Sequence, residues 1–387
     1  LVLLFVRCPP LARARMAACA QCCAEGCRYH GRHGSRSCRG CEEAARAAIR
    51  RGHVPRCAQC GQRDASGRVD ARQTCSFYCS ACWAAYEGDR LTEFFDEPAV
   101  LEEKCARLAE MIASARYAIA FTGAGISTGA GVADFRSGTN TVLPTGPGLW
   151  ERPKDAAPPP GAPRGGILEQ CARARPGRTH GVVQRLWEAG RLRHVISQNV
   201  DGLHRKSGIP RRALSELHGN IFVERCTRCG HEYERDFNVI CSGGLTGRHC
   251  EQRGCAHPLR HSGVGFGQDL PEEVVERAWA ESERADLCLA LGSSITVTPA
   301  SEMPAWVAKR HRGRQDKGLV IVNLQATPCD EAAALRINGL VDDVMERVEQ
   351  LLLQRGCSPG GVAALTAQTP SRGDAGRPGS PRATAAL

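Results

Sequence analysis

The chain has 387 residues, of which 42% are hydrophobic, and its formal net charge is +10. This composition excludes a wholly disordered chain, and the lack of any apolar run near ~20 residues excludes an integral membrane protein. Aromatic residues make up 5% of the chain, which argues against aromatic stacking platforms for single-stranded nucleic acid.

Residues 1–56 form a basic, cysteine-rich segment with zinc-finger-like spacing. Its arginines favour an acidic partner such as nucleic acid or chromatin, although a codon bias toward Ala, Gly and Arg explains them equally well. The ligand set stays open, because several side chains compete for one ion. The candidates are Cys19, Cys22, Cys38 and Cys41, with Cys23, Cys27, His30 and His33 as competitors.

Residues 57–90 carry a second cysteine cluster, at the spacing of a zinc ribbon. Its predicted ligands are Cys57, Cys60, Cys79 and Cys82, with Cys75 as a spare. Recurring cysteine pairs in a chain this long indicate zinc in a reducing compartment, not a secreted disulfide scaffold. The sequence starts at Leu1, and Met16 is an alternative start; an Arg-rich, acid-poor start is also typical of a mitochondrial transit peptide.

Residues 98–355 alternate between helical and strand patterns. In the first helix Leu101, Cys105, Leu108 and Ile112 share one face of a 3.6-residue period. Buried strands are expected at Tyr117–Phe121, Arg193–Ser197, Asp286–Leu291 and Leu319–Asn323, and helices at His180–Ala189, Pro271–Glu283 and Val341–Leu353. This alternation predicts an α/β fold with a doubly wound, parallel, Rossmann-like sheet. Residues 356–387, rich in Gly, Pro, Ser and Ala, are expected to be a disordered tail.

Polar motifs follow all four strands, at the sheet edge where such folds bind ligands. The first is Thr122-Gly123-Ala124-Gly125-Ile126-Ser127-Thr128, a turn that lets the backbone approach a pyrophosphate. Its glycine spacing departs from the dehydrogenase fingerprint, which disfavours hydride transfer. The others are Ser197–His204, Gly292-Ser293-Ser294 and Asn323-Leu324-Gln325. Each motif taken alone also fits an ordinary polar loop.

Two further motifs bring groups with specific chemistry. His218 follows Glu216-Leu217 and can accept a proton near neutral pH, although a lone histidine is more often structural. Four cysteines downstream fit a tetrahedral, structural zinc site, and the alternative is a set of buried reduced thiols. They are Cys226, Cys229, Cys250 and Cys255, with Cys241 as the spare.

In this order, the motifs GAGIS, DFR, QNVDGLH, LHG, the two cysteine pairs, FG-x-x-LP, GSS and NLQ resemble those of the sirtuin family over residues 98–355. The segments Ile321–Pro328, Leu335–Gly339 and Asp342–Met345 resemble its class IV branch, which includes nuclear, chromatin-associated members. The resemblance implies an NAD-dependent protein-lysine deacylase that acts on histones or other chromatin proteins. It also implies nuclear localisation, and mitochondrion and cytoplasm stay as alternatives. The lack of a long apolar run predicts no membrane partner.

The resemblance further assigns roles to individual residues. It implies an ADP-ribosyl imidate intermediate, with His218 as general base and with Asn199 and Asp201 positioning the nicotinamide and its ribose. The implied NAD contacts are Gly123, Ala124, Gly125, Thr128, Phe135, Arg136, Trp150, Gln198, Gly292, Ser293, Asn323, Gln325 and Val341. The acylated lysine peptide would add as a strand against Val264, Gly265, Phe266, Gly267, Ile295 and Val297. The four downstream cysteines would hold zinc in a module of about residues 220–262.

Several positions depart from the family pattern; they bear on NAD affinity and on the choice of acyl chain, not on the reaction class, and two rival functions stay open beside the leading one. Ala133 replaces a frequent Pro, Gln268 stands where Glu is common, and Ser137–Pro147 is longer than in the nuclear relatives. One rival is a mono-ADP-ribosyltransferase that uses the same site. The other is a zinc-finger chromatin adaptor whose domain only binds NAD or ADP-ribose, against which the presence of His218, Asn199 and Asp201 speaks.

Overall fold

The computed structural model describes residues 91–152, 166–265 and 268–356, two short strands nearer the N-terminus, and Arg63 and Ser80. The short strands are β1 (Arg68–Asp70) and β2 (Ser76–Tyr78), which pair antiparallel. The two N-terminal cysteine clusters, the C-terminal residues 357–387 and the substrate candidates Phe266 and Gly267 lie outside the described residues. Within the described ranges, none of the helices combines the length and apolar character that crossing a membrane requires.

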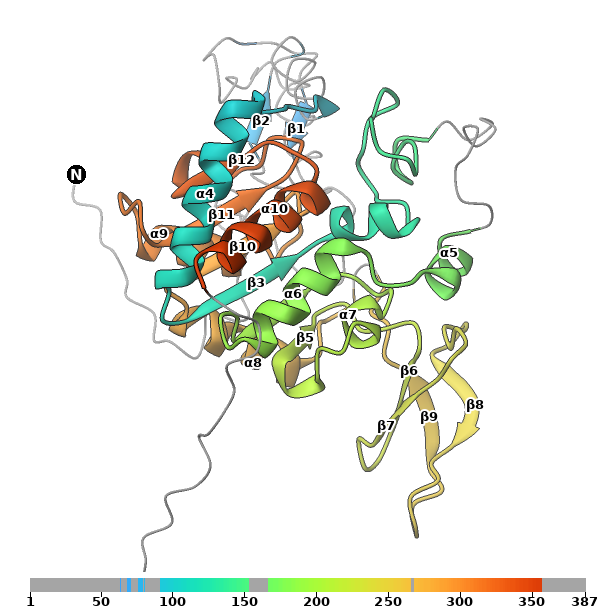
Figure 1. Ribbon diagram of the computed structural model, residues 1–387. Helices are drawn as coiled ribbons and strands as arrows, with labels where there is room; N and C mark the ends of the chain where they lie inside the picture. Colours follow the sequence, from blue (N-terminus) through green and yellow to red (C-terminus); the bar gives the residue numbers. More distant parts are fainter. Residues whose placement is uncertain are drawn as a thin grey trace, which may run out of the picture.

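A six-stranded parallel sheet forms the centre of the molecule (Figure 1). Its order is β12-β11-β10-β3-β4-β5, so that the first and fourth strands along the chain, β3 and β10, are neighbours. This is the dinucleotide-binding order, and the chain reverses its direction of travel between β3 and β10. The strands are β3 (Ala118–Thr122), β4 (His194–Ser197), β5 (Leu214–Glu216), β10 (Leu287–Leu291), β11 (Gly318–Val322) and β12 (Leu335–Ile337).

Helices cover both faces of this sheet (Figure 1). Because side chains alternate along a strand, Ala118 and Ala120 of β3 join the core on one face, and Ile119 and Phe121 join the core on the other. The first face is covered by α4 (Pro98–Ser114), α6 (Arg178–Glu188) and α10 (Val341–Gln354), and the second by α8 (Glu272–Arg284) and α9 (Glu302–Arg310). Burial on both sides explains why these strands are continuous apolar runs in the sequence.

A separate four-stranded antiparallel sheet, the cysteine-bearing sheet, lies between β5 and α8 in the chain and at the lower edge of the view in Figure 1. Its order is β7-β6-β9-β8. The strands are β6 (Val223–Cys226), β7 (Glu232–Glu234), β8 (Leu245–His249) and β9 (Pro258–His261). Its buried core contains Cys226, Cys250 and Leu259, which is too little apolar surface to stabilise a sheet without a further cross-link.

The predicted fold class is confirmed, and the four predicted strands and four predicted helices match observed elements to within a few residues. The sequence analysis missed several short elements, because segments of three to seven residues carry too little periodicity. These are β5, β12, the strands of the cysteine-bearing sheet, α5 (Ile167–Arg173), α7 (Leu203–Lys206) and the 3₁₀ turns η2 (Ala124–Ala130), η3 (Arg211–Ala213) and η4 (Asp330–Ala332). The longer α9 was missed as well; it contains Pro304 in its first turn, where a missing N–H costs no hydrogen bond.

Candidate active site

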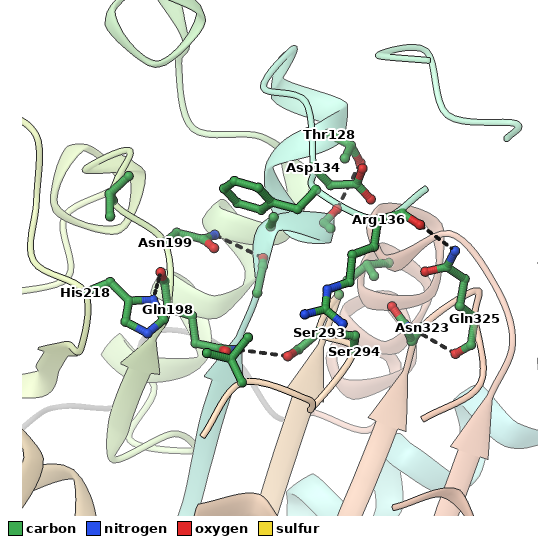
Figure 2. A pocket seen from close by; sticks show the side chains of 18 of the residues that line it. Thr128, Asp134, Arg136, Gln198, Asn199, His218, Ser293, Ser294, Asn323 and Gln325 are labelled. Carbon is green, nitrogen blue, oxygen red and sulfur yellow. Dashed lines mark hydrogen bonds between the residues drawn. The ribbon is translucent and has the colours of Figure 1, made fainter. Parts of the chain in front are cut away.

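A cavity of 1520 Å³ opens along the carboxyl ends of β3, β4, β10 and β11 (Figure 2). All four polar motifs that follow these strands contribute to its wall. The cavity therefore lies at the crevice where the strand order reverses, which is the ligand-binding position of a doubly wound sheet. Every residue predicted to contact NAD lines it.

Three glycines bring two strand ends into backbone contact at the floor of this cavity. The N–H of Gly125 donates to the carbonyl of Gly292 at 2.9 Å. A Cβ on Gly123 would lie 2.6 Å from the Gly292 oxygen, and a Cβ on Gly292 would lie 2.6 Å from the Ile126 nitrogen. Gly292 also has φ +57°, a conformation that disfavours other residues. No side chain fits between the two strand ends, so backbone borders the cavity here, which is the arrangement that lets a phosphate group approach main-chain N–H groups.

Polar groups from three strand ends form the next part of the wall (Figure 2). Gln198 Nε2 donates to Ser293 Oγ at 2.8 Å. Asn199 Nδ2 donates to the Gly123 carbonyl at 3.0 Å and lies 3.3 Å from Ser127 Oγ. These bonds hold both amide side chains in one orientation at the cavity surface.

Aromatic and cationic groups among the predicted NAD contacts also line the cavity. Phe135 and Trp150 pack with ring centroids 5.2 Å apart, and the Arg136 guanidinium lies 4.9 Å from the Trp150 centroid. Gln325 Nε2 donates to the Arg136 carbonyl at 3.0 Å, which ties this loop to the segment after β11. The segment 134–150 is thus anchored both by stacking and by the neighbouring strand end.

His218 lies in the wall of the same cavity, beside Gln198 (Figure 2). Its Nδ1 is 2.8 Å from the Gln198 carbonyl oxygen, which can only accept, so Nδ1 carries the proton and Nε2 keeps a lone pair. Burial lowers the pKa of His218 below its ordinary value, with the Gln198 bond opposing that shift. The imidazole is therefore neutral at pH 7 and able to accept a proton at Nε2.

Asp201 lies behind the cavity instead of in its wall. It is buried, and its carboxylate accepts from Ser127 Oγ at 2.7 Å and from the Leu203 N–H at 2.9 Å. Because Ser127 also contacts Asn199, Asp201 can act on a bound ligand through these two residues. Ser127 was missed as a site residue, although its place in the glycine motif after β3 was a usable signal.

The peptide-side candidates divide into three groups. Val264, Gly265 and Val297 line the cavity. Ile295 is buried away from the cavity wall and has φ +51°, while Phe266 and Gly267 lie outside the described residues. The sequence analysis missed the wall that α8 and the segment before it contribute at this end. It consists of Asp269, Leu270, Glu272, Val275, Glu276, Trp279, Ala280 and Glu283.

The four downstream cysteines converge in the cysteine-bearing sheet. Their sulfur atoms all lie within 4.8 Å of one another, with Cys226 and Cys255 3.5 Å apart and Cys229 and Cys250 3.6 Å apart. Tetrahedral zinc with Zn–S bonds of about 2.3 Å holds its sulfurs about 3.8 Å apart, so this set fits zinc. Cys241 Sγ instead bonds to the Leu245 carbonyl and is outside the set. Four thiolates leave no open position for substrate, which makes the site structural.

The geometry defines a dinucleotide-binding fold with a thiolate metal site, and comparisons with known proteins identify its family. The Sir2 family model matches residues 166–299. The NAD-dependent protein deacetylase Sirt6 of Drosophila melanogaster is 36% identical over 272 residues, which cover 67% of this chain and 78% of that protein. The chain belongs to the Sir2 family, the sirtuins.

Other relatives are longer than this chain. The NAD-dependent protein deacetylase SRT1 of Oryza sativa subsp. indica is 40% identical over 264 residues, which cover 68% of this chain and 51% of that protein. Human NAD-dependent protein deacetylase sirtuin-7 is 40% identical over 268 residues, covering 66% of this chain and 62% of that protein. The chain thus spans about half the length of the plant relatives it matches. Among solved structures, a mutant Sir2 homologue in complex with ADP-ribose superimposes with a TM-score of 0.50 at 30% identity, covering 65% of this chain and 97% of that one.

Proposed function

We propose that this protein is an NAD-dependent protein-lysine deacylase. The observation that carries the proposal is His218, a neutral imidazole whose free Nε2 lies in the same cavity as the Gly123–Gly292 floor. Relatives that bear the name NAD-dependent protein deacetylase support it. NAD supplies an electrophilic ribose carbon with nicotinamide as the leaving group.

The residues present fit such a co-substrate. The Gly123–Gly125 turn and Gly292 leave room for the pyrophosphate, and the aromatic pair Phe135 and Trp150 flanks that end of the cavity. Gln198 and Asn199 present oriented amides to the nicotinamide and ribose side. Held by the Gln198 carbonyl, His218 takes a proton from a ribose hydroxyl at Nε2, and Asp201 supports Asn199 from behind through Ser127.

We also propose that the peptides are rich in lysine and arginine, as in histones and other chromatin proteins. The support is the charge of the peptide-side wall, where Asp269, Glu272, Glu276 and Glu283 line the cavity. Acidic groups favour a cationic peptide over an acidic one through their summed field. We further propose that the protein is nuclear and that residues 1–56 bind nucleic acid. Both proposals agree with this substrate class and with the arginines of that segment.

The test is incubation of the full chain with NAD and an acetyl-lysine peptide. We expect nicotinamide and acetyl-ADP-ribose in equal amounts, and a loss of about 10²–10⁴-fold in turnover for His218→Ala. The matched control is His249→Ala, an exposed histidine on β8, which should keep full turnover. Protein labelled with ADP-ribose, without deacetylation, would instead identify a mono-ADP-ribosyltransferase.

Other outcomes of the same assay separate the remaining possibilities. Equal and negligible NAD consumption by wild type and His218→Ala, with nucleic-acid binding intact, would identify a chromatin adaptor. Peptide charge is tested by comparing acetyl-lysine flanked by arginines with acetyl-lysine flanked by glutamates. A preference for the acidic peptide would contradict the proposed substrate class without affecting the proposed reaction.

A further inference from the structure

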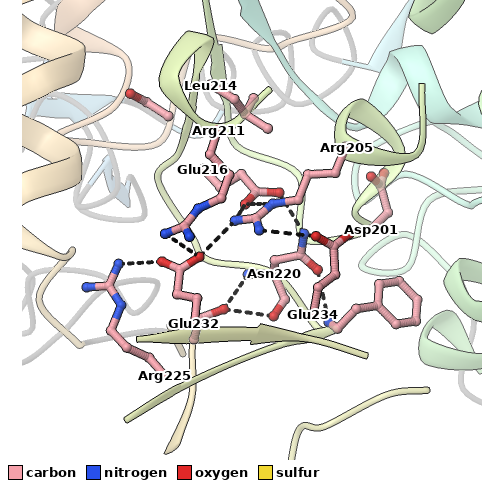
Figure 3. Close-up of polar contacts among 12 residues, drawn as sticks. Asp201, Arg205, Arg211, Leu214, Glu216, Asn220, Arg225, Glu232 and Glu234 are labelled. Carbon is pink, nitrogen blue, oxygen red and sulfur yellow. Dashed lines mark hydrogen bonds and ion pairs between the residues drawn. The ribbon is translucent and has the colours of Figure 1, made fainter. Parts of the chain in front are cut away.

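The loop that carries His218 is closed by one buried carboxylate (Figure 3). Glu216 Oε2 accepts from Arg205 Nε at 2.8 Å and from Arg205 Nη2 at 2.6 Å. Its other oxygen, Oε1, accepts from Asn220 Nδ2 at 2.7 Å. Glu216 precedes His218 by two residues and Asn220 follows it by two, so the hydrogen bond between them joins the two ends of the loop. We call Glu216, with its bonds to Arg205 and Asn220, the clasp.

Neighbouring backbone bonds leave the loop little freedom. The His218 carbonyl accepts from the Val264 N–H at 2.9 Å, and the Asn220 N–H donates to Ser262 Oγ at 3.0 Å. Gly219 has φ +74°, and a Cβ there would lie 1.9 Å from the Ser262 carbonyl oxygen. The imidazole itself makes one hydrogen bond, to Gln198. The direction in which the His218 imidazole points into the cavity therefore depends on where the two ends of the loop are held.

The clasp is joined to the cysteine-bearing sheet by the same arginine (Figure 3). Arg205 comes from α7, and its Nη2 lies 3.4 Å from Glu232 Oε2 on β7. Glu232 is also held by Arg211 at 2.7 Å and by Arg225 at 2.7 Å. The side chains of Arg205, Glu216 and Glu232 are 12%, 8% and 7% exposed, so water screens these pairs little. A displaced Glu232 would remove one of the three carboxylates around Arg205 and leave Glu216 and, at 3.6 Å, Glu234; a buried cation is less well compensated with fewer partners.

We propose that Glu216 is a positioning residue: held by Arg205, it fixes the direction of His218 in the cavity, and Glu232 makes that direction depend on the cysteine-bearing sheet. The role assigned to His218 rests on the proposed function. Glu216 touches no reacting atom and acts only through the loop. Loss of the clasp should lower turnover more than it weakens binding, because the residues predicted to contact NAD lie outside the loop of residues 216–220.

The experiment compares Glu216→Gln and Glu232→Gln with wild type in the full chain, with kcat, the KM for NAD and the KM for peptide measured separately. Glu216→Gln keeps the shape and an acceptor for Asn220 but removes the ion pair. We expect kcat to fall by about 10- to 100-fold with both KM values within about twofold. Glu232→Gln should lower kcat by a few-fold in the same way. The matched control is Glu273→Gln, whose carboxylate lies 3.8 Å from Arg225 but is 84% exposed; it should change nothing.

A second readout does not need activity. Long-range ¹H–¹⁵N spectra of the histidines report which ring nitrogen of His218 is protonated and whether one tautomer or a mixture of two is present. Wild type should show the Nδ1–H tautomer, and both glutamine variants should show a mixture. Should Glu216→Gln not fold, Glu232→Gln alone decides.

An unchanged kcat, or a raised KM for NAD at unchanged kcat, in the folded Glu216→Gln variant would overturn the positioning role. An unchanged tautomer would overturn it as well. Absence of NAD-dependent deacylation in wild type would overturn the proposed function instead, and the tautomer comparison would still test the clasp.

Discussion

The parallel sheet and the cysteine-bearing sheet are held together by different forces. In the parallel sheet, β3, β10 and β11 are buried along their whole length, and packed helices cover both faces. In the cysteine-bearing sheet β8 alternates between exposed and half-buried residues, and Glu224 is buried against Arg235 and Arg248 instead of apolar groups. Hydrophobic burial needs no ligand, whereas four cysteines whose sulfurs lie within 4.8 Å of one another stabilise a sheet only when a cation binds between them. The parallel sheet should thus stay folded when metal removal unfolds the cysteine-bearing sheet.

Metal removal should show this contrast most strongly. Structural zinc sites contribute about 10–16 kcal/mol to folding in small domains, so chelation or Cys250→Ser should unfold residues 223–261. Hydrogen exchange would show lost protection there and retained protection in β3 and β10. Cys241→Ser is the control and should leave zinc content and exchange unchanged. Equal loss of protection in both sheets would mean that they form one cooperative unit.

Within the parallel sheet, the contact between Gly125 and Gly292 should be the most sensitive point. Gly292→Ala places a Cβ 2.6–2.8 Å from the backbone of the glycine turn and should lower the free energy of unfolding by about 2–4 kcal/mol. NAD binding, measured by calorimetry, should be lost with it. Gly313→Ala has a similar φ, +79°, but no neighbour within 4 Å, and should cost about 1 kcal/mol. Similar losses for the two variants would show that strain, not crowding, sets the effect.

Acid should weaken the parallel sheet through a buried neutral histidine. Burial, aided by Arg277, lowers the pKa of His194 to about 4, and its Nε2 lies 2.8 Å from Ser215 Oγ. Below pH 6.5 the unfolded chain binds a proton that the folded chain does not, so stability falls as pH drops from 6.5 to 4. The slope for one histidine is about 1.4 kcal/mol per pH unit.

Urea unfolding at pH 5 and pH 7 measures that slope in wild type and in His194→Gln. The variant should have the shallower pH dependence. His249→Gln, on the exposed face of the other sheet, is the control. An unchanged slope in His194→Gln would contradict the assignment.

The smallest effect is expected at the extended loop between Arg136 and Gly148, which belongs to neither sheet. Glu93 accepts from Thr141 Oγ1 and from the Val142 N–H at 3.0 Å, and Leu143 and Pro144 of the loop line the cavity. Glu93→Gln should loosen this wall and raise the KM for NAD by about two- to fivefold at unchanged kcat. Glu97→Gln, before α4, is the control. A changed kcat would show that the loop affects chemistry as well as binding.

The local sequence by itself determined the main helices and strands, the cysteine ligand set and the shared cavity of this protein. The apolar periodicity at Leu101–Ile112 predicts α4, and continuous apolar runs predict the buried strands, because each pattern reports how one element meets its surroundings. The spacing of Cys226, Cys229, Cys250 and Cys255 also predicts a ligand set, because each closely spaced pair brings two sulfur atoms near one ion. The order of strand-end motifs was enough to predict one shared cavity.

Only the tertiary structure decided which residues from distant segments come into contact. Asp201 stands behind Ser127, the acidic wall of α8 faces the cavity, and Gly292 meets Gly125 across 167 positions of chain. The clasp of Glu216 by Arg205, and its link to Glu232, likewise joins elements whose sequences give no sign of pairing. A carboxylate carries no periodic signal of its partner, since its pairing depends on which surfaces the packed sheets bring together and exclude from water.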